Sequence, residues 1–419
     1  MQQPKLSICI PTFNRSQFLI QLLNNLKGQI TEDLLSYVEI CISNNASEDN
    51  TKEVVECFMK EHSNLSVVYS ENEENIFEEN FIKAVEISNA EFCWLIGDDD
   101  LPEEGAVARV LQELTTDLDI LLFDVKHFDF NMEEHLGTVK CFKHIDKSRV
   151  FDFSIQSDML EYFEKATAKN MLFTFISNTV FKRASWIKAG KIQKAKEFLG
   201  KCSNHVFLNL DTLVNEKGRI KYINDSLVWY RSGNNPKDYS EKLLYHHYCY
   251  LQLSGINYTI EGTVQDEELR KAIKNILKKD LSIFFFCGCQ LREDESTFIY
   301  SFYDQEDVGI YKHVNYGVEE IQNNREPVIL FGASNFGKTV LELLQEKGVF
   351  VECFSDNSEG KWATDFCGKP VVAPIDLIKF GQPLIIITSM YVKQIYRQLS
   401  GMGFQNIKHI SNWDQQCII

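Results

Sequence analysis

The sequence lacks any segment suited to crossing a membrane and any N-terminal targeting signal. No stretch of its 419 residues approaches the roughly 20 apolar residues of a spanning helix. The apolar run Ile283-Phe284-Phe285-Phe286, within Leu281 to Cys289, is too short for that. The N-terminus has neither the charged start nor the long apolar core of a signal peptide. We therefore expect a cytoplasmic protein, and peripheral association at the inner face of the membrane stays open.

A basic surplus and paired cysteine motifs are also missing. The formal net charge is −17, and no segment supplies the concentrated basic face that nucleic-acid phosphates require. Nucleic acid is therefore excluded as the expected partner. Twelve cysteines are scattered without a CxxC pair, which is typical of reduced, buried thiols.

Low-complexity tracts and internal repeats are absent as well, so the composition is that of a globular protein. The chain is 44% hydrophobic, 12% aromatic and 25% charged, close to ordinary folded domains. Its length predicts two or three domains.

Strands and helices alternate in the N-terminal half. Four short apolar runs predict strands at residues 6–10, 38–42, 65–69 and 92–96. Amphipathic stripes predict helices around 18–26 and 54–59, with Ser16 and Ser47 as their N-caps. This alternation favours an α/β fold with a parallel sheet covered on both faces, and a site at the carboxyl ends of the strands.

Strand patterns fade after about Tyr239 and restart at Pro327. We expect a domain over residues 1–238, a helical linker domain over 239–325 and a small Rossmann-like domain over 326–419.

Three adjacent carboxylates follow the fourth predicted strand, in Gly97-Asp98-Asp99-Asp100. Carboxylates repel one another, so a fold tolerates such a run best where a hard divalent cation neutralises them. If the segment stays extended, Asp98 and Asp100 point to the same side and form a DxD pair that could hold Mn²⁺ or Mg²⁺. The competing interpretation is an acidic surface turn.

Two polar turns follow the first two strands, Pro11-Thr12-Phe13-Asn14-Arg15 and Ser43-Asn44-Asn45-Ala46-Ser47-Glu48-Asp49. Their free N–H groups and short side chains are suited to a base, ribose or phosphate. Either turn alone is typical of a capped loop.

In this order and spacing, LSICIPTFNR, SNNASEDNT and WLIGDDD resemble motifs of the inverting family-two glycosyltransferases of the GT-A fold, over residues 5–235. The form WLIGDDD is most similar to the abequosyltransferase-like branch. The resemblance implies transfer from a nucleotide-sugar donor to a glycan or lipid-linked glycan acceptor, in bacterial surface polysaccharide assembly. The roles that it implies are nucleotide binding by Pro11, Thr12, Asn14, Arg15, Asn44 and Asp49, and metal and phosphate binding by Asp98 and Asp100.

The sequence departs from the family at two positions. Asn44 stands where an aspartate often accepts from the base, so the identity of the base stays open. The acidic pair that usually supplies the catalytic base is missing, and the sequence there is Asn204-His205-Val206-Phe207. His205 is our first candidate for the base because a neutral imidazole can accept a proton near pH 7. Asp211 is the second. A structural histidine is an equal alternative.

Two weaker features complete the set of candidates. Arg231 could reach the diphosphate as a cationic clamp, with a surface ion pair as the alternative. In the C-terminal segment, a strand, a glycine turn and a helix precede an acid, which is the context of dinucleotide binding. The candidate residues there are Gly332, Ser334, Gly337 and Asp356. Two further functions therefore stay open: an oxidoreductase or modifying protein that binds NAD or a nucleotide-sugar at this turn, and a non-catalytic nucleotide-sugar-binding scaffold.

Overall fold

The computed structural model describes residues 3–142, 144–167, 172–198, 204–233, 242–286, 315–316, 321, 323–389 and 391–410. Two compact units divide the chain. The first comprises Met1–Ser240 and His247–Leu277, and the second comprises Glu241–His246 and Lys278–Ile419. Each unit is described by itself.

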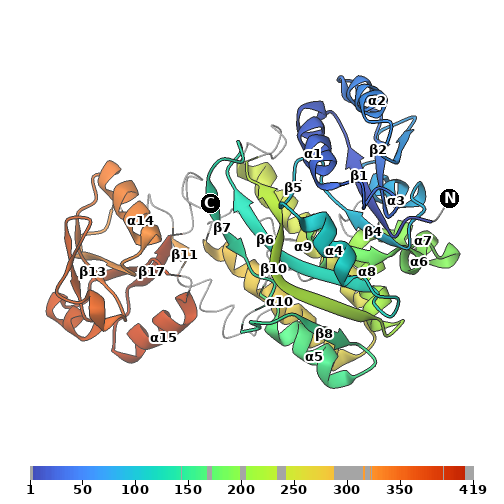
Figure 1. The fold of residues 1–419 in the computed structure, drawn as a ribbon. Coiled ribbons are helices and arrows are strands. Elements are labelled where there is room, and N and C mark those ends of the chain that lie inside the picture. Colours follow the sequence, from blue (N-terminus) through green and yellow to red (C-terminus); the bar gives the residue numbers. More distant parts are fainter. Residues whose placement is uncertain are drawn as a thin grey trace. The chain divides into compact units, whose positions relative to one another are not determined.

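The first unit is built on a sheet that has ten strands among the described residues (Figure 1). Its main order is β3-β2-β1-β4-β9-β6-β10-β5, with β7 beside β6 and β8 beside β10. The strands are β1 (Leu6–Thr12), β2 (Val38–Asn44), β3 (Val67–Glu71), β4 (Phe92–Leu95), β5 (Leu101–Pro102), β6 (Ile120–Phe128), β7 (His135–Val139), β8 (Arg149–Asp152), β9 (Thr179–Lys182) and β10 (Arg219–Arg231).

Strands β1, β2, β3 and β4 are parallel where they pair, so their carboxyl ends meet at one edge of the sheet. Every residue of β1 and β2 is buried, as expected for parallel strands covered on both faces. The register pairs Thr12 with Asn44. The polar turns after β1 and β2 therefore start side by side.

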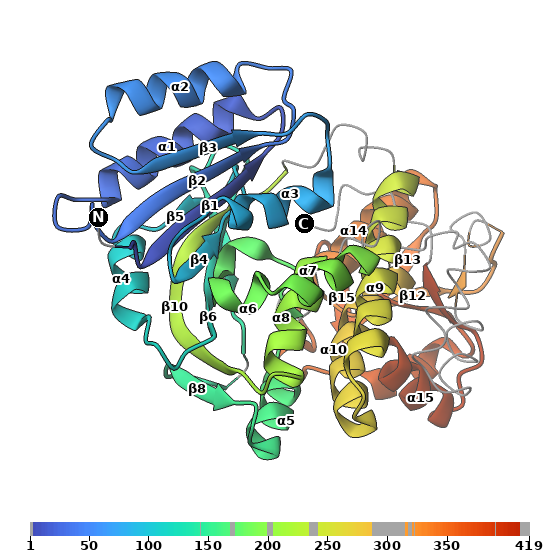
Figure 2. The same ribbon diagram turned by 90° about the vertical axis from the view of Figure 1, so that its right-hand side faces the viewer.

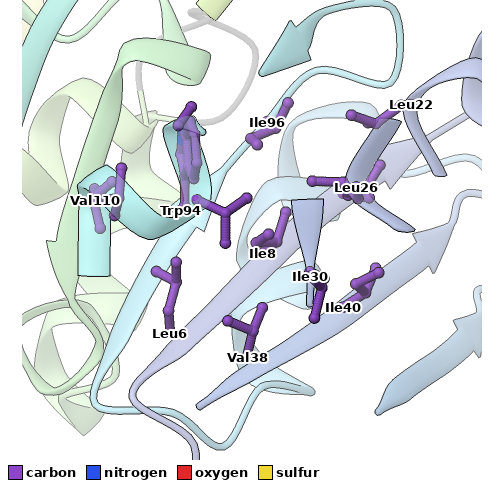
Figure 3. Packing of buried hydrophobic residues seen from close by; sticks show 14 of the residues in the cluster. Leu6, Ile8, Leu22, Leu26, Ile30, Val38, Ile40, Trp94, Ile96 and Val110 are labelled. Atoms are coloured by element: carbon purple, nitrogen blue, oxygen red, sulfur yellow. The ribbon is translucent and has the colours of Figure 1, made fainter. Parts of the chain in front are cut away.

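Helices cover both faces of this part of the sheet (Figure 2). Leucines at helical spacing give α1 an apolar stripe, and Leu26 lies over Ile8 and Ile40 (Figure 3). The same core takes in α2 and α4. On the opposite face α3 is fixed by a hydrogen bond from Ser43 to Asn80. The bounds are α1 (Ser16–Gln29), α2 (Thr51–Glu61), α3 (Phe77–Glu86) and α4 (Ala106–Glu113).

Strand β9 interrupts the parallel order, because it lies antiparallel between β4 and β6. Its first residues therefore lie at the carboxyl end of β4. The short 3₁₀ helix η2 (Ile176–Asn178) directly precedes β9, so it also lies at that edge.

The remaining helices of the first unit follow the sheet strands or lie between them. They are α5 (Gln156–Lys165), α6 (Arg183–Trp186), α7 (Ala189–Ala195), η3 (Lys196–Phe198) and α8 (Asn204–Val214). Two long helices, α9 (Lys242–Thr263) and α10 (Glu267–Phe286), occupy the first part of the predicted helical linker. Most of that linker beyond Phe286 lies outside the described residues.

The second unit contains a mostly parallel sheet in the order β11-β17-β16-β12-β13-β15-β14. Two apolar clusters line its two faces, one with α14 and the other with α15 and η6. The elements are β11 (Asn315–Tyr316), β12 (Val328–Phe331), α14 (Asn335–Glu346), β13 (Val351–Ser355), η5 (Glu359–Lys361), β14 (Asp365–Phe366), β15 (Lys369–Val372), η6 (Pro374–Phe380), β16 (Leu384–Ile387), α15 (Val392–Gly401) and β17 (Ile407–Ile410).

The predicted α/β fold is confirmed, but the predicted helix caps are wrong. Helix α1 starts at Ser16 itself and α2 starts at Thr51, with no side-chain cap from Ser16 or Ser47. The carboxylate of Asp49 accepts hydrogen bonds from the N–H groups of both Ser16, at 3.0 Å, and Thr51, at 3.1 Å. One acid from the second turn therefore serves the starts of two helices.

No helix within the described residues has the length and apolarity to span a membrane. The cysteines Cys9 and Cys41 are buried free thiols, whereas Cys57 and Cys367 are exposed.

Candidate functional site

The acidic segment forms a tight turn at the carboxyl end of β4. The Asp100 N–H donates to the Gly97 carbonyl at 3.1 Å. The segment is therefore not extended, which is the condition under which we expected Asp98 and Asp100 to point to the same side. We call residues Gly97–Asp100 the acidic turn.

Asp98 joins the acidic turn to the loop after β1. Its carboxylate accepts a hydrogen bond from the Thr12 hydroxyl at 2.7 Å and from the Arg15 guanidinium at 3.1 Å. Arg15 also lies 3.3 Å from the Asp99 carboxylate. The sequence-predicted residues Thr12, Arg15 and Asp98 thus come together. Pro11 is buried beside Thr12 at the end of β1.

Asp100 is held from the other side of the turn. Its carboxylate accepts from the Ser177 hydroxyl at 2.6 Å and from the Arg231 N–H at 3.3 Å. Ser177 was not among the predicted site residues. Its signal in the sequence is a Ser-Asn pair directly before the apolar run of β9, which resembles the polar turns after β1 and β2 but precedes a strand.

The three carboxylates of the turn are poorly compensated by nearby positive charge. Burial and the neighbouring Asp99 carboxylate raise the pKa of Asp98 to about 6, against the opposing effect of Arg15. Burial and Asp99 also raise the pKa of Asp100 well above its usual range. Burial alone would lower the pKa of Arg15, but Asp98 and Asp99 raise it. The turn therefore favours an additional positive charge.

The donor atoms of the acidic turn fit a hard divalent cation. They are carboxylate oxygens, the ligands that Mg²⁺ and Mn²⁺ prefer, and each oxygen that accepts one hydrogen bond keeps a second lone pair. No group of three or more His, Cys, Asp or Glu side chains among the described residues is arranged to hold a metal ion. Mg²⁺ usually takes one or two protein carboxylates and completes its shell with phosphate and water.

The loops after β1 and β2 are tied to each other. Asn14, at φ 53°, accepts from the Glu48 N–H at 2.7 Å and donates its own N–H to the Ser47 hydroxyl at 2.9 Å. Asp49 adds the bonds to the starts of α1 and α2 described above. Asn14 and Asp49 therefore shape the two loops into one surface beside the acidic turn.

Asn44 is buried at the end of β2 and both ends of its amide are engaged. Its oxygen accepts from the Ser47 N–H at 3.1 Å, and its nitrogen donates to the Tyr69 hydroxyl at 2.9 Å. Next to it, the Asn45 side chain bonds Asn75 and the Ile76 N–H of the loop before α3. Neither Tyr69 nor Asn45 was a predicted site residue, because a lone tyrosine or a second asparagine gives no signal of its own.

Arg231 lies at the end of β10 and is 3% exposed. Its guanidinium donates to the carbonyls of Asp99 at 3.0 Å and Phe130 at 2.6 Å, and to the Gln21 side chain at 2.8 Å. It also lies over the Phe18 ring, 4.8 Å from the centroid. These contacts connect the acidic turn to α1.

His205 lies in the first turn of α8 and is 7% exposed. Its ring packs edge-on against Phe81, and burial lowers its pKa to about 4, against a hydrogen bond with the Thr174 backbone. The imidazole is therefore neutral at pH 7, but it is a weak proton acceptor.

Asp211, the second candidate base, lies near the other end of α8. Its carboxylate is 3.2 Å from the Nζ of the buried Lys191 and accepts from Asn215 at 2.8 Å. The Asp211 carboxylate is therefore engaged by Lys191 and Asn215.

In the second unit, side-chain hydrogen bonds hold the glycine turn between β12 and α14 in place. Ser334 caps α14 by accepting from the Gly337 N–H at 3.3 Å. Asp356 accepts from the Ala333 N–H and from Lys361, both at 2.9 Å. Gly332 has φ 128°, a conformation that glycine adopts most readily.

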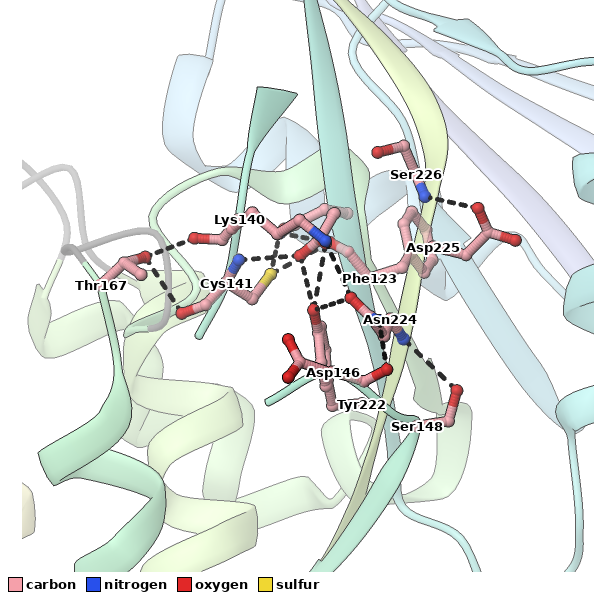
Figure 4. Close-up of polar contacts among 12 residues, drawn as sticks. Phe123, Lys140, Cys141, Asp146, Ser148, Thr167, Tyr222, Asn224, Asp225 and Ser226 are labelled. Atoms are coloured by element: carbon pink, nitrogen blue, oxygen red, sulfur yellow. Dashed lines mark hydrogen bonds and ion pairs between the residues drawn. The ribbon is translucent and has the colours of Figure 1, made fainter. Parts of the chain in front are cut away.

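A hollow of about 520 Å³ lies on the first unit and is lined by Val139, Lys140, Phe142, His144, Ile145, Asp146 and Thr167. The Tyr222 hydroxyl lies 3.0 Å from both carboxylate oxygens of the buried Asp124, and the Cys141 N–H donates to the same carboxylate. Figure 4 shows Tyr222, Cys141 and Lys140 close together in this cluster. Lys140, 3.4 Å from Asp124, also bonds Asn224. Since these groups satisfy one another, the cluster fixes this segment on β6 and β10.

Comparison with known families gives two matches. Residues 7–167 match the family described as Glycosyl transferase family 2, and residues 324–410 match the one described as C2185-like, N-terminal. The first match contains the loops after β1 and β2 and the acidic turn, but neither Ser177 nor Arg231.

Among characterised relatives, the chain is similar to abequosyltransferase RfbV of Salmonella typhimurium, with 27% identity over 305 residues, 71% of this chain and 88% of the relative. It is also similar to the GalNAc(5)-diNAcBac-PP-undecaprenol beta-1,3-glucosyltransferase of Campylobacter jejuni, with 30% identity over 26% of this chain and 34% of that one. The solved structure of S. aureus TarS 1-349 in complex with UDP-GlcNAc aligns with a TM-score of 0.50 at 15% identity, over 87% of this chain and 98% of the TarS 1-349 chain. This likeness concerns the fold.

Proposed function

Because the protein is a glycosyltransferase with a family 2 domain at residues 7–167 and a GT-A fold, we propose that it is an inverting, metal-dependent enzyme. It transfers a sugar from a nucleotide-sugar to an acceptor hydroxyl. The observation that carries the proposal is the acidic turn, whose Asp98 is bonded directly to Thr12 and Arg15 of the loop after β1.

The two tied loops after β1 and β2 hold the nucleotide in this proposal. Asn14 and Asp49 link the two loops by hydrogen bonds. Asn44 stabilises the second loop, because its side-chain oxygen accepts from the Ser47 N–H. The N–H groups and polar side chains of these loops face the nucleoside. Arg15 supplies positive charge between the loop and the acidic turn.

Asp98 and Asp100 would hold Mn²⁺ or Mg²⁺ at the edge of the sheet. When bound, such an ion stabilises the charge that develops on the departing nucleoside diphosphate. Arg231 uses three of its five side-chain N–H donors for bonds within the protein, and in this proposal it holds the backbone of the turn in place. The cationic clamp on the diphosphate that we predicted from the sequence stays the alternative role for Arg231.

The candidate bases are His205 and Asp211. A general base works best when its pKa is near the working pH, and His205, with a pKa of about 4, is well below it. Asp211 is paired with Lys191. The variants His205→Gln and Asp211→Asn decide between the two candidates. The variant that lacks the base should lose transfer activity and keep its affinity for the donor. Wild-type rates in both variants would assign the proton to another group.

The acceptor is a glycan or lipid-linked glycan of bacterial surface polysaccharide assembly. The similarity to an abequosyltransferase and to an undecaprenol-linked glucosyltransferase supports this class. Residues 326–419 form a separate Rossmann-like module in this proposal, in line with the distinct family match at 324–410.

The test combines ligand binding with one variant. A thermal-shift panel of nucleoside diphosphates and nucleotide-sugars, with and without Mn²⁺, should give stabilisation that depends on the metal, because a ligand that binds only the native state raises its stability. Asp100→Ala should lose this stabilisation and the transfer activity while it stays folded. Equal stabilisation without metal, or near-normal transfer by Asp100→Ala, would refute the proposal.

A further inference from the structure

We infer that Ser177 is a positioning residue that presents the acidic turn to a divalent cation; the inference rests on the proposed function of that turn. The Ser177 hydroxyl is buried and makes two hydrogen bonds to the turn. It accepts from the Gly97 N–H at 2.9 Å and donates to the Asp100 carboxylate at 2.6 Å. The first and last residues of the turn are therefore held by one side chain.

Ser177 is itself held in place by its neighbours. Its carbonyl accepts from the Trp94 indole of β4 at 2.8 Å. The next residue, Asn178, donates to the Phe123 carbonyl of β6 at 3.1 Å. Helix η2 is thus fixed to the strands on both sides of β9, and the hydroxyl does not depend on a mobile segment for its orientation.

Loss of this hydroxyl would change the turn more than its surroundings. The Gly97 N–H would lose its acceptor, and the Asp100 carboxylate would lose the donor that fixes one of its oxygens. The carboxylates of Asp99 and Asp100 both lie near Gly97, 3.0 and 3.3 Å from the point where a Cβ would stand. The Arg231 N–H would still donate to Asp100, at 3.3 Å. Because the Asp99 carboxylate repels a charged Asp100, we expect the oxygen that Ser177 no longer holds to move from its position.

The chain offers a closely matched control in Ser7. This serine is also fully buried in the same sheet, donates to the Glu39 carboxylate at 2.6 Å and accepts from the Ala90 N–H at 3.1 Å. It belongs to the first part of β1, whereas the acidic turn lies beside the carboxyl end of that strand. Ser7→Ala therefore removes the same kinds of bond without touching the turn.

The experiment measures Mn²⁺ binding to the full-length protein by electron paramagnetic resonance, with Mn²⁺ alone as the probe, and unfolding midpoints in urea. We expect Ser177→Ala and Ser7→Ala to lower the midpoint to a similar extent. Only Ser177→Ala should weaken Mn²⁺ binding, by roughly tenfold, the scale seen when a partner of a metal ligand is removed. If Ser177→Ala fails to fold, Ser177→Cys keeps the volume with a weaker donor, and it should also bind Mn²⁺ more weakly.

Each outcome bears on a different statement. Unchanged Mn²⁺ affinity in the Ser177 variants, or equal weakening in Ser7→Ala, would overturn the positioning role and leave the proposed function intact. A wild-type protein that binds no Mn²⁺ would overturn the metal dependence in the proposed function, and the inference with it.

Discussion

Arg231 provides the most direct test of how the acidic turn is supported. Its guanidinium makes three hydrogen bonds, to Asp99, Phe130 and Gln21. A hydrogen bond from a charged donor contributes about 1.5–3 kcal/mol, so the lower figure gives about 4.5 kcal/mol for the three bonds together. A lysine at this position keeps the positive charge but lacks the planar guanidinium, and we expect it to make one of the three hydrogen bonds.

Arg231→Lys should therefore lower the free energy of unfolding by about 3 kcal/mol in the absence of any ligand. Urea denaturation followed by tryptophan fluorescence measures this, since Trp94, Trp186 and Trp229 all belong to the first unit. The control is Arg149→Lys, which changes a partly exposed pair with Glu161 and should cost at most about 1 kcal/mol.

The opposite pattern would refute this reasoning. If Arg231→Lys unfolds at the wild-type urea concentration but binds nucleoside diphosphates much more weakly, the guanidinium contacts the phosphates, as a clamp would. The expected pattern is a large loss of stability without ligand, with any loss of binding following from it.

Three further predictions test other parts of the structure. Gly97→Ala places a Cβ 3.0 Å from the Asp99 carboxylate, so transfer should fall by about 10²-fold with little change in melting temperature; a stable and fully active variant would contradict this. Gly337→Ala makes a Cβ clash with the Gly332 carbonyl. Calorimetry should therefore show that the second unit loses its transition while the first keeps its own; two intact transitions would be the contrary result. His205 has a pKa of about 4, below its ordinary 6.5, so the stability that its neutral form contributes is present above pH 6.5 and is lost as the pH falls towards 4. Between pH 7 and pH 5, His205→Gln should therefore lose about 2 kcal/mol less than the wild type in urea unfolding, and identical losses would show that burial does not shift the pKa.

The sequence predicted the parts of the site that follow strands directly. The apolar runs of β1, β2 and β4 are continuous, and parallel strands bring their carboxyl ends together, so the loops with Thr12 and Asn44 and the acidic turn could be expected at one edge. The pairing of Thr12 with Asn44 and the bond from Thr12 to Asp98 agree with that expectation.

Other features depend on contacts that no local pattern reveals. Ser177 reaches the acidic turn because β9 runs antiparallel beside β4, and an antiparallel insertion has no marker in a short apolar run such as TVFK. The burial of His205 depends on Phe81 from a distant helix. The caps were wrong for a similar reason, since Asp49 serves α1 from the next loop.

The residues that hold the acidic turn in place lie far from it in the sequence, and this affects the order in which the site forms during synthesis. Asp100 is bonded to Ser177, 77 residues later, and to Arg231, 131 residues later. A nascent chain therefore exposes its three carboxylates well before the ribosome has made the groups that arrange them. Until β10 has been synthesised and has joined the sheet, the growing chain has the acidic residues without their native geometry, so the arrangement of the three carboxylates is acquired late in biosynthesis.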